Sequence, residues 1–388
     1  MQKSLGGAFL VVGTTIGAGM LSLPLITAAS GLWASVILII LSWSVMYVTG
    51  LKLIRVCEKY PLGVNYTTLI KSHMPISLQI IFTIVYLLLL YALMAAYTTQ
   101  GAALVSLVAA AQHVSVSIDA IVFILIFGLV ILSAKLSDYV NRSFVSLKLI
   151  FYALCVISML VCLKWANFIH GPLSLYALIF AWPTLLPSFG FQNIIPVLYE
   201  YQKGDVKAVR KSVLIGSLMV LVIYLIWVAV CLAILPQTGA HSYESIFQAG
   251  NTLNSFMAEV KVATQSAWIN TFLSVFINIS IITSFICVGL SLYHYIKDTC
   301  SRFGYQMNKV IGFLLTFIPP FVFTVFYPKG FILALQYAAI FAVVIFVFTP
   351  VYLDKSEKSP FKNYYALTLG ALVIVAQILN LLGISQPF

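Results

Sequence analysis

Long uncharged runs constrain this chain more than any other feature of its sequence. No Asp, Glu, Lys or Arg lies between Lys3 and Lys52, or between Lys71 and Asp119. The runs mix Leu, Ile, Val and Phe without the strict alternation that barrel strands require. Only 8% of the 388 residues are charged and 62% are hydrophobic, so a soluble protein of this size could not cover its surface. The sequence therefore predicts an all-α integral membrane protein.

Hydropathy and the distribution of basic residues predict the topology. Eleven transmembrane helices are expected, at roughly 5–30, 32–55, 76–110, 118–135, 144–163, 173–199, 212–235, 266–296, 309–327, 331–350 and 364–384. With the N-terminus inside, the outer face receives only Lys164, Lys261 and Lys329, while Lys148 lies within the fifth span. The remaining Lys and Arg residues then face the cytoplasm, as the positive-inside rule requires. The same rule accounts for the net charge of +11, so no nucleic-acid partner is expected.

Two segments outside the spans carry structural signals. "VNYTTLIKSHM", after the second span, is typical of a short interfacial helix on the inner face. "HSYESIFQAGNTLNSFMAEVKVA", before the eighth, is the largest external segment and has apolar residues at helical spacing. It is either a solvated connector or a lid that packs into an outer vestibule.

Two spans interrupt themselves at matching positions. The first contains GTTIGAG over 13–19, and the sixth contains PSFGFQN over 187–193. Because the sixth span comes five after the first and five is odd, two successive five-helix halves must enter the membrane in opposite directions. Paired interruptions of this kind are typical of inverted-repeat transporters with a binding site near the bilayer midplane. The predicted organisation is a first half over 1–165, an inverted half over 166–350 and an extra C-terminal helix over 351–388.

The residue types in the interruptions suit a small-molecule site. Unwound backbone in hydrocarbon costs several kcal/mol per unsatisfied group unless it lines a cavity or binds a ligand. Glycine permits the dihedral angles and the close ligand approach, and the N-terminus of a resuming half-helix favours a carboxylate. A packing seam is the alternative, since Gly13 and Gly17 have small-xxx-small spacing. The predicted substrate-binding residues are Thr14, Thr15, Ile16, Gly17, Ala18, Gly19, Tyr97, Thr98, Ser188, Phe189, Gly190, Phe191, Gln192 and Asn193.

Four stretches resemble a known family: "VGTTIGAGMLSLP", "LLYALMAAYTTQGAAL", "PSFGFQNIIPVLYEY" and "TSFICVGLSLYHYIKD". They are similar to the bacterial aromatic amino acid permeases, the tyrosine- and tryptophan-specific branch. The resemblance implies the leucine-transporter fold of the amino acid–polyamine–organocation superfamily, with a 5+5 inverted repeat, and proton-coupled uptake of Tyr, Trp or Phe. It also implies a bacterial inner-membrane location. The chain departs from the family at Gln192, where many relatives have a titratable His and an amide cannot titrate.

The coupling ion leaves two alternatives. In other branches of the superfamily, a Lys in the fifth helix replaces a sodium ion, and here Lys148 is in that helix while Thr283 and Ser284 resemble the hydroxyl pair of the ion site. A Lys near a helix end can instead snorkel to the headgroups. Sodium coupling is the other alternative, with Thr283, Ser284 and the carbonyls of Gly13 and Ile16 as ligands. Glu200 and His294 are the next candidates for the proton carrier.

The sequence favours a secondary transporter over two other classes. We expect proton symport of an aromatic amino acid by alternating access, with membrane lipids, proton and substrate as the partners. An intramembrane enzyme would need a polar catalytic cluster on different helices, and the Ser291–His294 pair on one helix does not provide it. A passive channel fits paired helix breaks less well than a closed site. The five histidines have no ligand spacing, and no metal or cofactor is expected.

Overall fold

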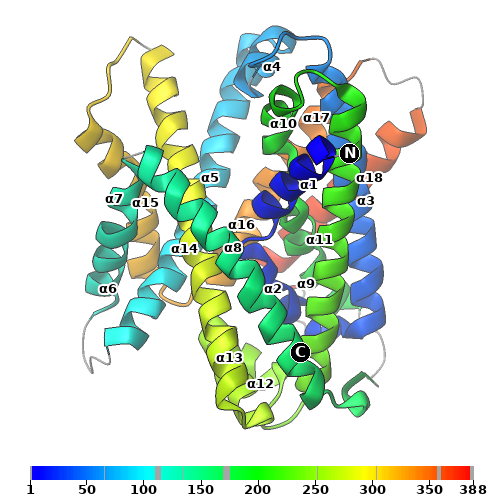
Figure 1. Ribbon diagram of the computed structural model, residues 1–388, viewed down its shortest axis with the longest axis vertical. Coiled ribbons are helices and arrows are strands. Elements are labelled where there is room, and N and C mark those ends of the chain that lie inside the picture. The colour runs from blue at the N-terminus through cyan, green and yellow to red at the C-terminus, as the bar shows by residue number, and fades with distance from the viewer. Residues whose placement is uncertain are drawn as a thin grey trace. The chain divides into compact units, whose positions relative to one another are not determined.

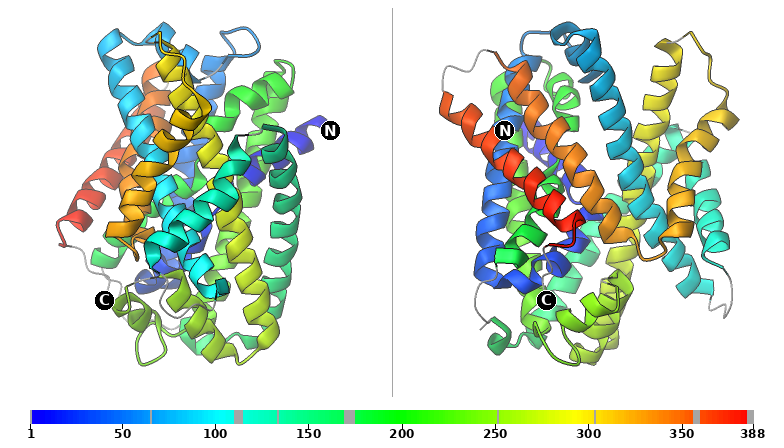
Figure 2. Two further views of the ribbon diagram at one scale, coloured as in Figure 1. Left: turned by 90° about the vertical axis from the view of Figure 1, so that its left-hand side faces the viewer. Right: turned by 180° about the vertical axis from the view of Figure 1, so that it is seen from behind.

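The computed structural model describes residues 2–64, 66–109, 115–132, 134–168, 175–250, 252–302, 304–355 and 360–384. Every regular element within these ranges is helical (Figures 1 and 2). The α-helices are α1 (Gln2–Thr15), α2 (Gly19–Thr27), α3 (Gly31–Cys57), α4 (Tyr66–His73), α5 (Ile76–Ala109), α6 (Val116–Phe123), α7 (Leu129–Ile131), α8 (Ala134–Met159), α9 (Leu175–Leu185), α10 (Ile195–Tyr201), α11 (Val206–Ile234), α12 (Tyr243–Gln248), α13 (Leu253–Thr264), α14 (Ala267–Arg302), α15 (Lys309–Phe326), α16 (Phe331–Val343), α17 (Thr349–Leu353) and α18 (Pro360–Leu381).

Shorter turns complete these helices. The 3-10 turns are η1 (Ala28–Ser30), η3 (Leu160–Cys162), η4 (Trp165–Phe168), η5 (Pro187–Phe189) and η6 (Gln192–Ile194). The π-helical turns are η2 (Ile124–Gly128), between α6 and α7, and η7 (Val344–Phe348), between α16 and α17. Turns of this type inside apolar helices are enriched at functional positions of membrane and soluble proteins alike.

The described residues contain nine helical stretches long and apolar enough to cross a membrane, against eleven expected from the sequence. The expected first and fourth spans appear as shorter apolar helices, Ser4–Thr15 and Val116–Ile131. The second part of the first span joins the second span in one stretch, Gly19–Cys57, which turns at Gly31. Gly31 has φ +73°, a left-handed conformation that favours glycine. The interruption of the first span thus shortens α1 below the length of a full span.

The chain forms two compact units, each assembled from separated parts of the sequence. Unit 1 comprises Met1–Tyr86, Gly171–Ala229 and Ala339–Phe388. Unit 2 comprises Leu87–His170 and Val230–Ala338. Each unit therefore contains segments from both halves that the sequence predicts, 1–165 and 166–350. The division into those two halves stays a prediction.

In unit 1, α3 is the central helix and contacts α9, α10, α17 and α18. The first helix, α1, is fixed to α11 at its beginning, where the Ser212 hydroxyl donates to the Ser4 carbonyl at 2.9 Å. One turn on, a Cβ atom at Gly216 of α11 would lie 2.7 Å from the Ala8 carbonyl oxygen. Glycine at 216 thus allows the two helices to approach at backbone distance, as small residues do in membrane proteins.

Unit 2 is built on α14, which packs against α8 along much of its length and also contacts α7, α13 and α15 (Figure 1). On α5, a Cβ atom at Gly101 would lie 2.3 Å from the ring of Phe123 on α6, so glycine makes room for that ring. The Phe123 ring in turn meets Phe285 of α14 edge-on, with centroids 4.8 Å apart. The Phe123 ring of α6 thus packs against both α5 and α14.

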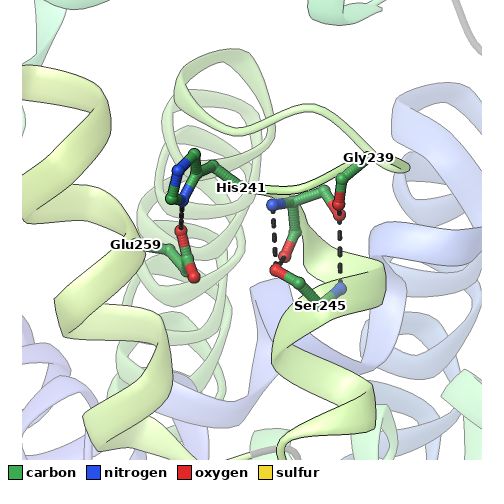
Figure 3. A network of polar contacts seen from close by, with 5 residues as sticks. Gly239, His241, Ser245 and Glu259 are labelled. Atoms are coloured by element: carbon green, nitrogen blue, oxygen red, sulfur yellow. Dashed lines mark hydrogen bonds and ion pairs between the residues drawn. The ribbon is translucent and has the colours of Figure 1, made fainter.

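The segment before the eighth span, for which the sequence left two alternatives, is a packed helical hairpin within unit 2. Ser242 and Ser245 form a reciprocal capping box at the start of α12. His241 Nδ1 lies 2.9 Å from Glu259 Oε2 and joins the start of α12 to α13 (Figure 3). Leu253, Phe256 and Val260 repeat at helical spacing on α13 and are fully buried. This burial excludes a merely solvated connector.

Candidate functional site

The first predicted helix break is present in unit 1. Helix α1 ends at Thr15, and α2 begins at Gly19. Across the break, Met20 N–H donates to the Gly17 carbonyl at 3.2 Å and Leu21 N–H donates to the Ala18 carbonyl at 3.1 Å, so the resuming turn is tighter than an α-helix. Ala18 occupies the N-cap position, and its methyl side chain makes no capping hydrogen bond to the first turn of α2. An uncapped helix N-terminus favours an anionic group.

The threonines of the first motif serve the end of α1. Thr14 and Thr15 hydroxyls donate to the Leu10 and Val11 carbonyls at 2.8 and 2.7 Å. Each hydroxyl thus adds a second bond to a carbonyl one turn earlier in the same helix, the usual back-bond of a helical threonine. Thr15, Ile16 and Ala18 are buried, Gly13, Gly17 and Gly19 are half-buried, and Thr14 is exposed. Their contact with substrate or ion stays a prediction.

The second predicted break, also in unit 1, runs from the end of α9 at Leu185 to the start of α10 at Ile195. Gly190 has φ −70° and ψ 84°, and Phe191 N–H donates to the Phe189 carbonyl at 2.9 Å, which together form an inverse γ-turn. A Cβ atom at Gly190 would lie 2.9 Å from the Pro187 carbonyl oxygen and 3.0 Å from the ring of Phe346. Only glycine fits this turn.

Tyr224 on α11 joins the two breaks. Its hydroxyl lies 2.9 Å from the carbonyl oxygen of Thr15, the last residue of α1, and 2.8 Å from the carbonyl oxygen of Ser188 in the second break. Its ring packs against Phe189 with centroids 4.9 Å apart, and the residue is completely buried. Sequence reasoning missed this tyrosine. Its position in the middle of an apolar span was a usable signal, because a phenol there needs a polar partner.

The aromatic and amide residues of the second motif face the interior of unit 1. Phe189 and Phe191 are fully buried, and the Phe191 ring fills the space over Gly50 on α3. The Gln192 amide nitrogen donates to the Met46 carbonyl at 3.1 Å and to the Thr49 hydroxyl at 3.0 Å.

Gln192 therefore ties the second break to α3. Its amide oxygen is buried and has no hydrogen-bond partner among the described residues. Ser188 is half-buried, and its hydroxyl donates to the Thr184 carbonyl at 2.9 Å. Asn193 is exposed. Direct contact of these residues with a ligand stays a prediction, and both phenylalanines would need a different packing to stack on one.

Of the four predicted coupling residues, Lys148, Thr283 and Ser284 belong to unit 2, whereas Gly13 belongs to unit 1. Helix α8 begins at Ala134, earlier than the sequence predicts, so Lys148 lies in its middle rather than near its end. Lys148 is 2% exposed and does not snorkel out of unit 2. It lies within electrostatic reach of Cys287 on α14. Thr283 is one helical turn before Cys287, and residues four apart share a helix face.

Hydroxyl groups line this part of α14. Thr283 is buried and its hydroxyl donates to the Ile279 carbonyl at 2.9 Å. Ser284 is 9% exposed and shares a hydrogen bond with Tyr97 of α5. The buried hydroxyl of Ser280, one turn earlier, has no hydrogen-bond partner among the described residues. Ser280 was not predicted as a site residue.

The remaining candidates differ in burial. Tyr97 is 6% exposed, and Thr98 is fully buried with its hydroxyl donating to the Met94 carbonyl at 2.8 Å. Glu200 and His294 are exposed at the ends of α10 and α14. Within the described ranges no group of three or more His, Cys, Asp or Glu side chains could hold a metal ion.

Comparison with known proteins decides the family. The sequence matches the Tryptophan/tyrosine permease family over residues 1–386. The chain belongs to this family. It is 33% identical to the tyrosine-specific transport system 1 of Haemophilus influenzae, over 100% of this chain and 97% of that protein. The tryptophan-specific transport protein of the same organism is 29% identical, over 100% of this chain and 99% of that protein. The low affinity tryptophan permease of Escherichia coli is also 29% identical, over 98% of this chain and 93% of that protein.

This permease is therefore a transport protein rather than an enzyme, and a multi-pass protein of the bacterial inner membrane. Its fold is similar to that of a manganese transporter from Eremococcus coleocola, with a TM-score of 0.66 and 13% identity. That similarity covers 97% of this chain and 85% of the other. A mutant of the same transporter gives a TM-score of 0.64. At this identity the likeness describes the fold alone.

Proposed function

We propose that this permease imports aromatic amino acids, Tyr, Trp or Phe, by proton symport with alternating access. The observation that carries the substrate class is the family match over residues 1–386, together with relatives named as tyrosine- and tryptophan-specific transporters that align along nearly their whole length. The alignments cover 97% and 99% of these two relatives' lengths, which supports the same cargo class for this chain.

The substrate's charged ends would bind at the first helix break. Its carboxylate would meet the first turn of α2, where the N-cap residue Ala18 makes no capping bond with its side chain. Its ammonium would meet carbonyl oxygens of the unwound segments over 16–18 and 186–194. Opposite charges at the two ends of an amino acid thus match the opposite polarity of the backbone on the two sides of a break.

Alternating access would use two five-helix halves, 1–165 and 166–350, in a leucine-transporter-like 5+5 arrangement with eleven helices and a cytoplasmic N-terminus. The excess of Lys and Arg in the expected inner loops supports this orientation. The composition of the compact units supports the motion. Unit 1 contains the first, second, sixth and seventh spans, apart from the last turn of α11, and unit 2 contains the fourth, eighth and ninth spans and most of the third. These are the groups of helices expected to rock against each other.

Lys148 would couple transport to the proton gradient. A buried cation in the middle of α8, within electrostatic reach of Cys287 on α14, supports this proposal, because ionisable groups buried inside membrane proteins commonly serve ion pathways. A lysine can release its proton when its surroundings change, which a fixed cation cannot do. Exchange of that proton between the two sides of the membrane would then accompany each transport cycle.

The deciding experiment is uptake of radiolabelled Tyr, Trp and Phe into proteoliposomes under separately imposed proton and sodium gradients. We expect concentrative uptake with an inward proton gradient and none with sodium alone. Sodium-driven uptake would assign Thr283 and Ser284 to a sodium site instead. Tyramine should compete poorly with tyrosine, because it lacks the carboxylate; equal competition would overturn the half-helix assignment.

A further inference from the structure

The hydroxyl of Tyr224 contacts one carbonyl oxygen in each helix break. The two distances, 2.9 Å to Thr15 and 2.8 Å to Ser188, are both within hydrogen-bond range. Thr15 and Ser188 are 173 residues apart in sequence, yet both belong to unit 1 with Tyr224. All three atoms therefore lie within one compact unit.

A phenol has a single hydrogen to donate. The Tyr224 hydroxyl must share it between the two carbonyls or alternate between them. Either arrangement holds the two carbonyl oxygens close together although they repel each other electrostatically. Without the hydroxyl, both carbonyls would remain in a buried region with one donor fewer, which destabilises the arrangement that brings them together.

A second contact brings the same two breaks together. A Cβ atom at Gly19, the first residue of α2, would lie 3.5 Å from the Ser188 hydroxyl oxygen, an ordinary van der Waals separation. The ring of Phe189, next to Ser188, packs on the ring of Tyr224. The end of α1, the start of α2 and the second break thus meet around one side chain.

We propose that Tyr224 is a positioning residue for the substrate site: its hydroxyl holds the two helix breaks in a fixed relation, so that both present their backbone groups to the same ligand and move as one piece. This inference rests on the proposed transport of aromatic amino acids. It assigns to α11 a role that the motif residues on the broken helices do not have.

The first test is substrate affinity of Tyr224→Phe in the purified full-length permease, measured by calorimetric titration with Tyr, Trp and Phe. The variant keeps the ring against Phe189 and removes only the hydroxyl. We expect the dissociation constant to rise roughly tenfold, corresponding to the loss of one buried hydrogen bond. The matched control is Tyr91→Phe, because the Tyr91 hydroxyl also donates to a backbone carbonyl, that of Leu315, at 2.8 Å. We expect unchanged affinity in the control.

The second test measures the geometry of the breaks without substrate. The double variant Gly19→Cys/Ser188→Cys places one cysteine in each break, and the rate at which the two form a disulfide under oxidation is measured. Mass spectrometry of the disulfide-linked peptide that contains residues 19 and 188 distinguishes this product from disulfides of the native cysteines. We expect Tyr224→Phe to slow this cross-link several-fold and Tyr91→Phe to leave it unchanged.

The two tests separate this inference from the proposed function. If the parent protein binds none of the three amino acids, the proposed substrate class fails while the cross-linking rate still reports on Tyr224. An unchanged cross-linking rate and an unchanged affinity per folded molecule in Tyr224→Phe would overturn the positioning role. A lower yield or melting temperature of Tyr224→Phe with both readouts unchanged would count against the proposal in the same way, since it would reduce Tyr224 to a packing residue.

Discussion

The ring of Phe191 lies against Gly50, where a Cβ atom on α3 would come within 2.7 Å of the ring. Phe191 belongs to the second helix break and is completely buried. The break thus inserts an aromatic side chain into a notch on α3 that only the absence of a side chain creates. This contact, together with the Gln192 amide on Met46 and Thr49, fixes the break to α3.

Gly50→Ala should force the Phe191 ring out of its place. Overpacking of a filled interior costs about 1–3 kcal/mol, so we expect a clear fall in melting temperature and in transport per folded molecule. The double variant Gly50→Ala/Phe191→Leu has room for the added methyl group and should recover much of the lost stability. A single Gly50→Ala variant with parental melting temperature would show that the notch is not needed.

Two glycines of the breaks should respond differently to alanine. At Gly190 the new methyl group would meet the Pro187 backbone carbonyl at 2.9 Å, and backbone cannot move aside as a side chain does. Gly190→Ala should therefore abolish transport. At Gly19 the methyl group would meet only the Ser188 hydroxyl at 3.5 Å, so Gly19→Ala should fold and leave the melting temperature unchanged. Equal melting curves for the two variants would contradict the conclusion that only glycine fits at position 190.

Gly17 lies in the unwound segment between α1 and α2. Gly17→Val should abolish transport while protein remains detectable in the membrane, because a β-branched side chain restricts the backbone and blocks a ligand's approach. Uptake of labelled tyrosine, divided by the amount of protein in the membrane, tests this. Parental uptake would make the first break a packing seam.

Lys148→Ala should stop concentrative uptake driven by a proton gradient while leaving exchange of labelled for unlabelled substrate. Lys148→Arg should show the same loss, because a guanidinium keeps the charge and does not release its proton. Lys164→Ala is the matched control, since Lys164 is exposed beyond the end of α8. Proton-driven accumulation of substrate by Lys148→Ala would remove this lysine from the coupling mechanism.

The ion pair between α3 and the residue after α17 should stabilise unit 1. Arg55 Nη2 and Nε lie 2.8 and 2.9 Å from Asp354 Oδ2, and the Asp354 side chain is fully buried. Asp354→Asn should cost about 1.5–3 kcal/mol, the range for a hydrogen bond to a charged group. Glu58→Gln is the comparison: Glu58 pairs with Arg210 at 3.8 Å, and both side chains are half-exposed. We expect this variant to leave the free energy of unfolding almost unchanged. Chemical or thermal unfolding in detergent measures both.

Tyr66, on α4 outside the spans, should make the protein sensitive to alkali. Burial of its phenol, with smaller contributions from Tyr86 and Cys57, raises the pKa of Tyr66 above its ordinary value. The unfolded chain then loses this proton at lower pH than the folded one, so stability falls as the pH rises above about 10. Tyr66→Phe loses the hydrogen bond to the Ile345 carbonyl, so its melting temperature at pH 8 should be lower than the parent's. Between pH 8 and 10.5, however, the melting temperature of the variant should fall less than that of the parent.

The sequence by itself determined that the chain lies in a membrane, that it is helical, and where two of its helices are interrupted. Uncharged runs of 20 residues or more require helices in a membrane, because no other open structure satisfies the backbone there. The third expected span, 76–110, corresponds to α5 at Ile76–Ala109. The interruptions near 16–18 and 186–194 were predictable for a similar local reason: Gly and Pro change what the backbone can do at their own position.

Only the tertiary structure decided which side chains complete the breaks. Tyr224, Gly50 and the amide of Gln192 act across segments far apart in sequence, and hydropathy does not record which face of a helix meets which neighbour. The tertiary structure also shows how the expected first span is divided, because α1 stops at Thr15 and α2 begins at Gly19. The placement of Lys148 was decided in the same way. The apolar run predicted a span over 144–163, which matches the candidate span Ser143–Cys162, but only packing against α14 decides that Lys148 is buried there.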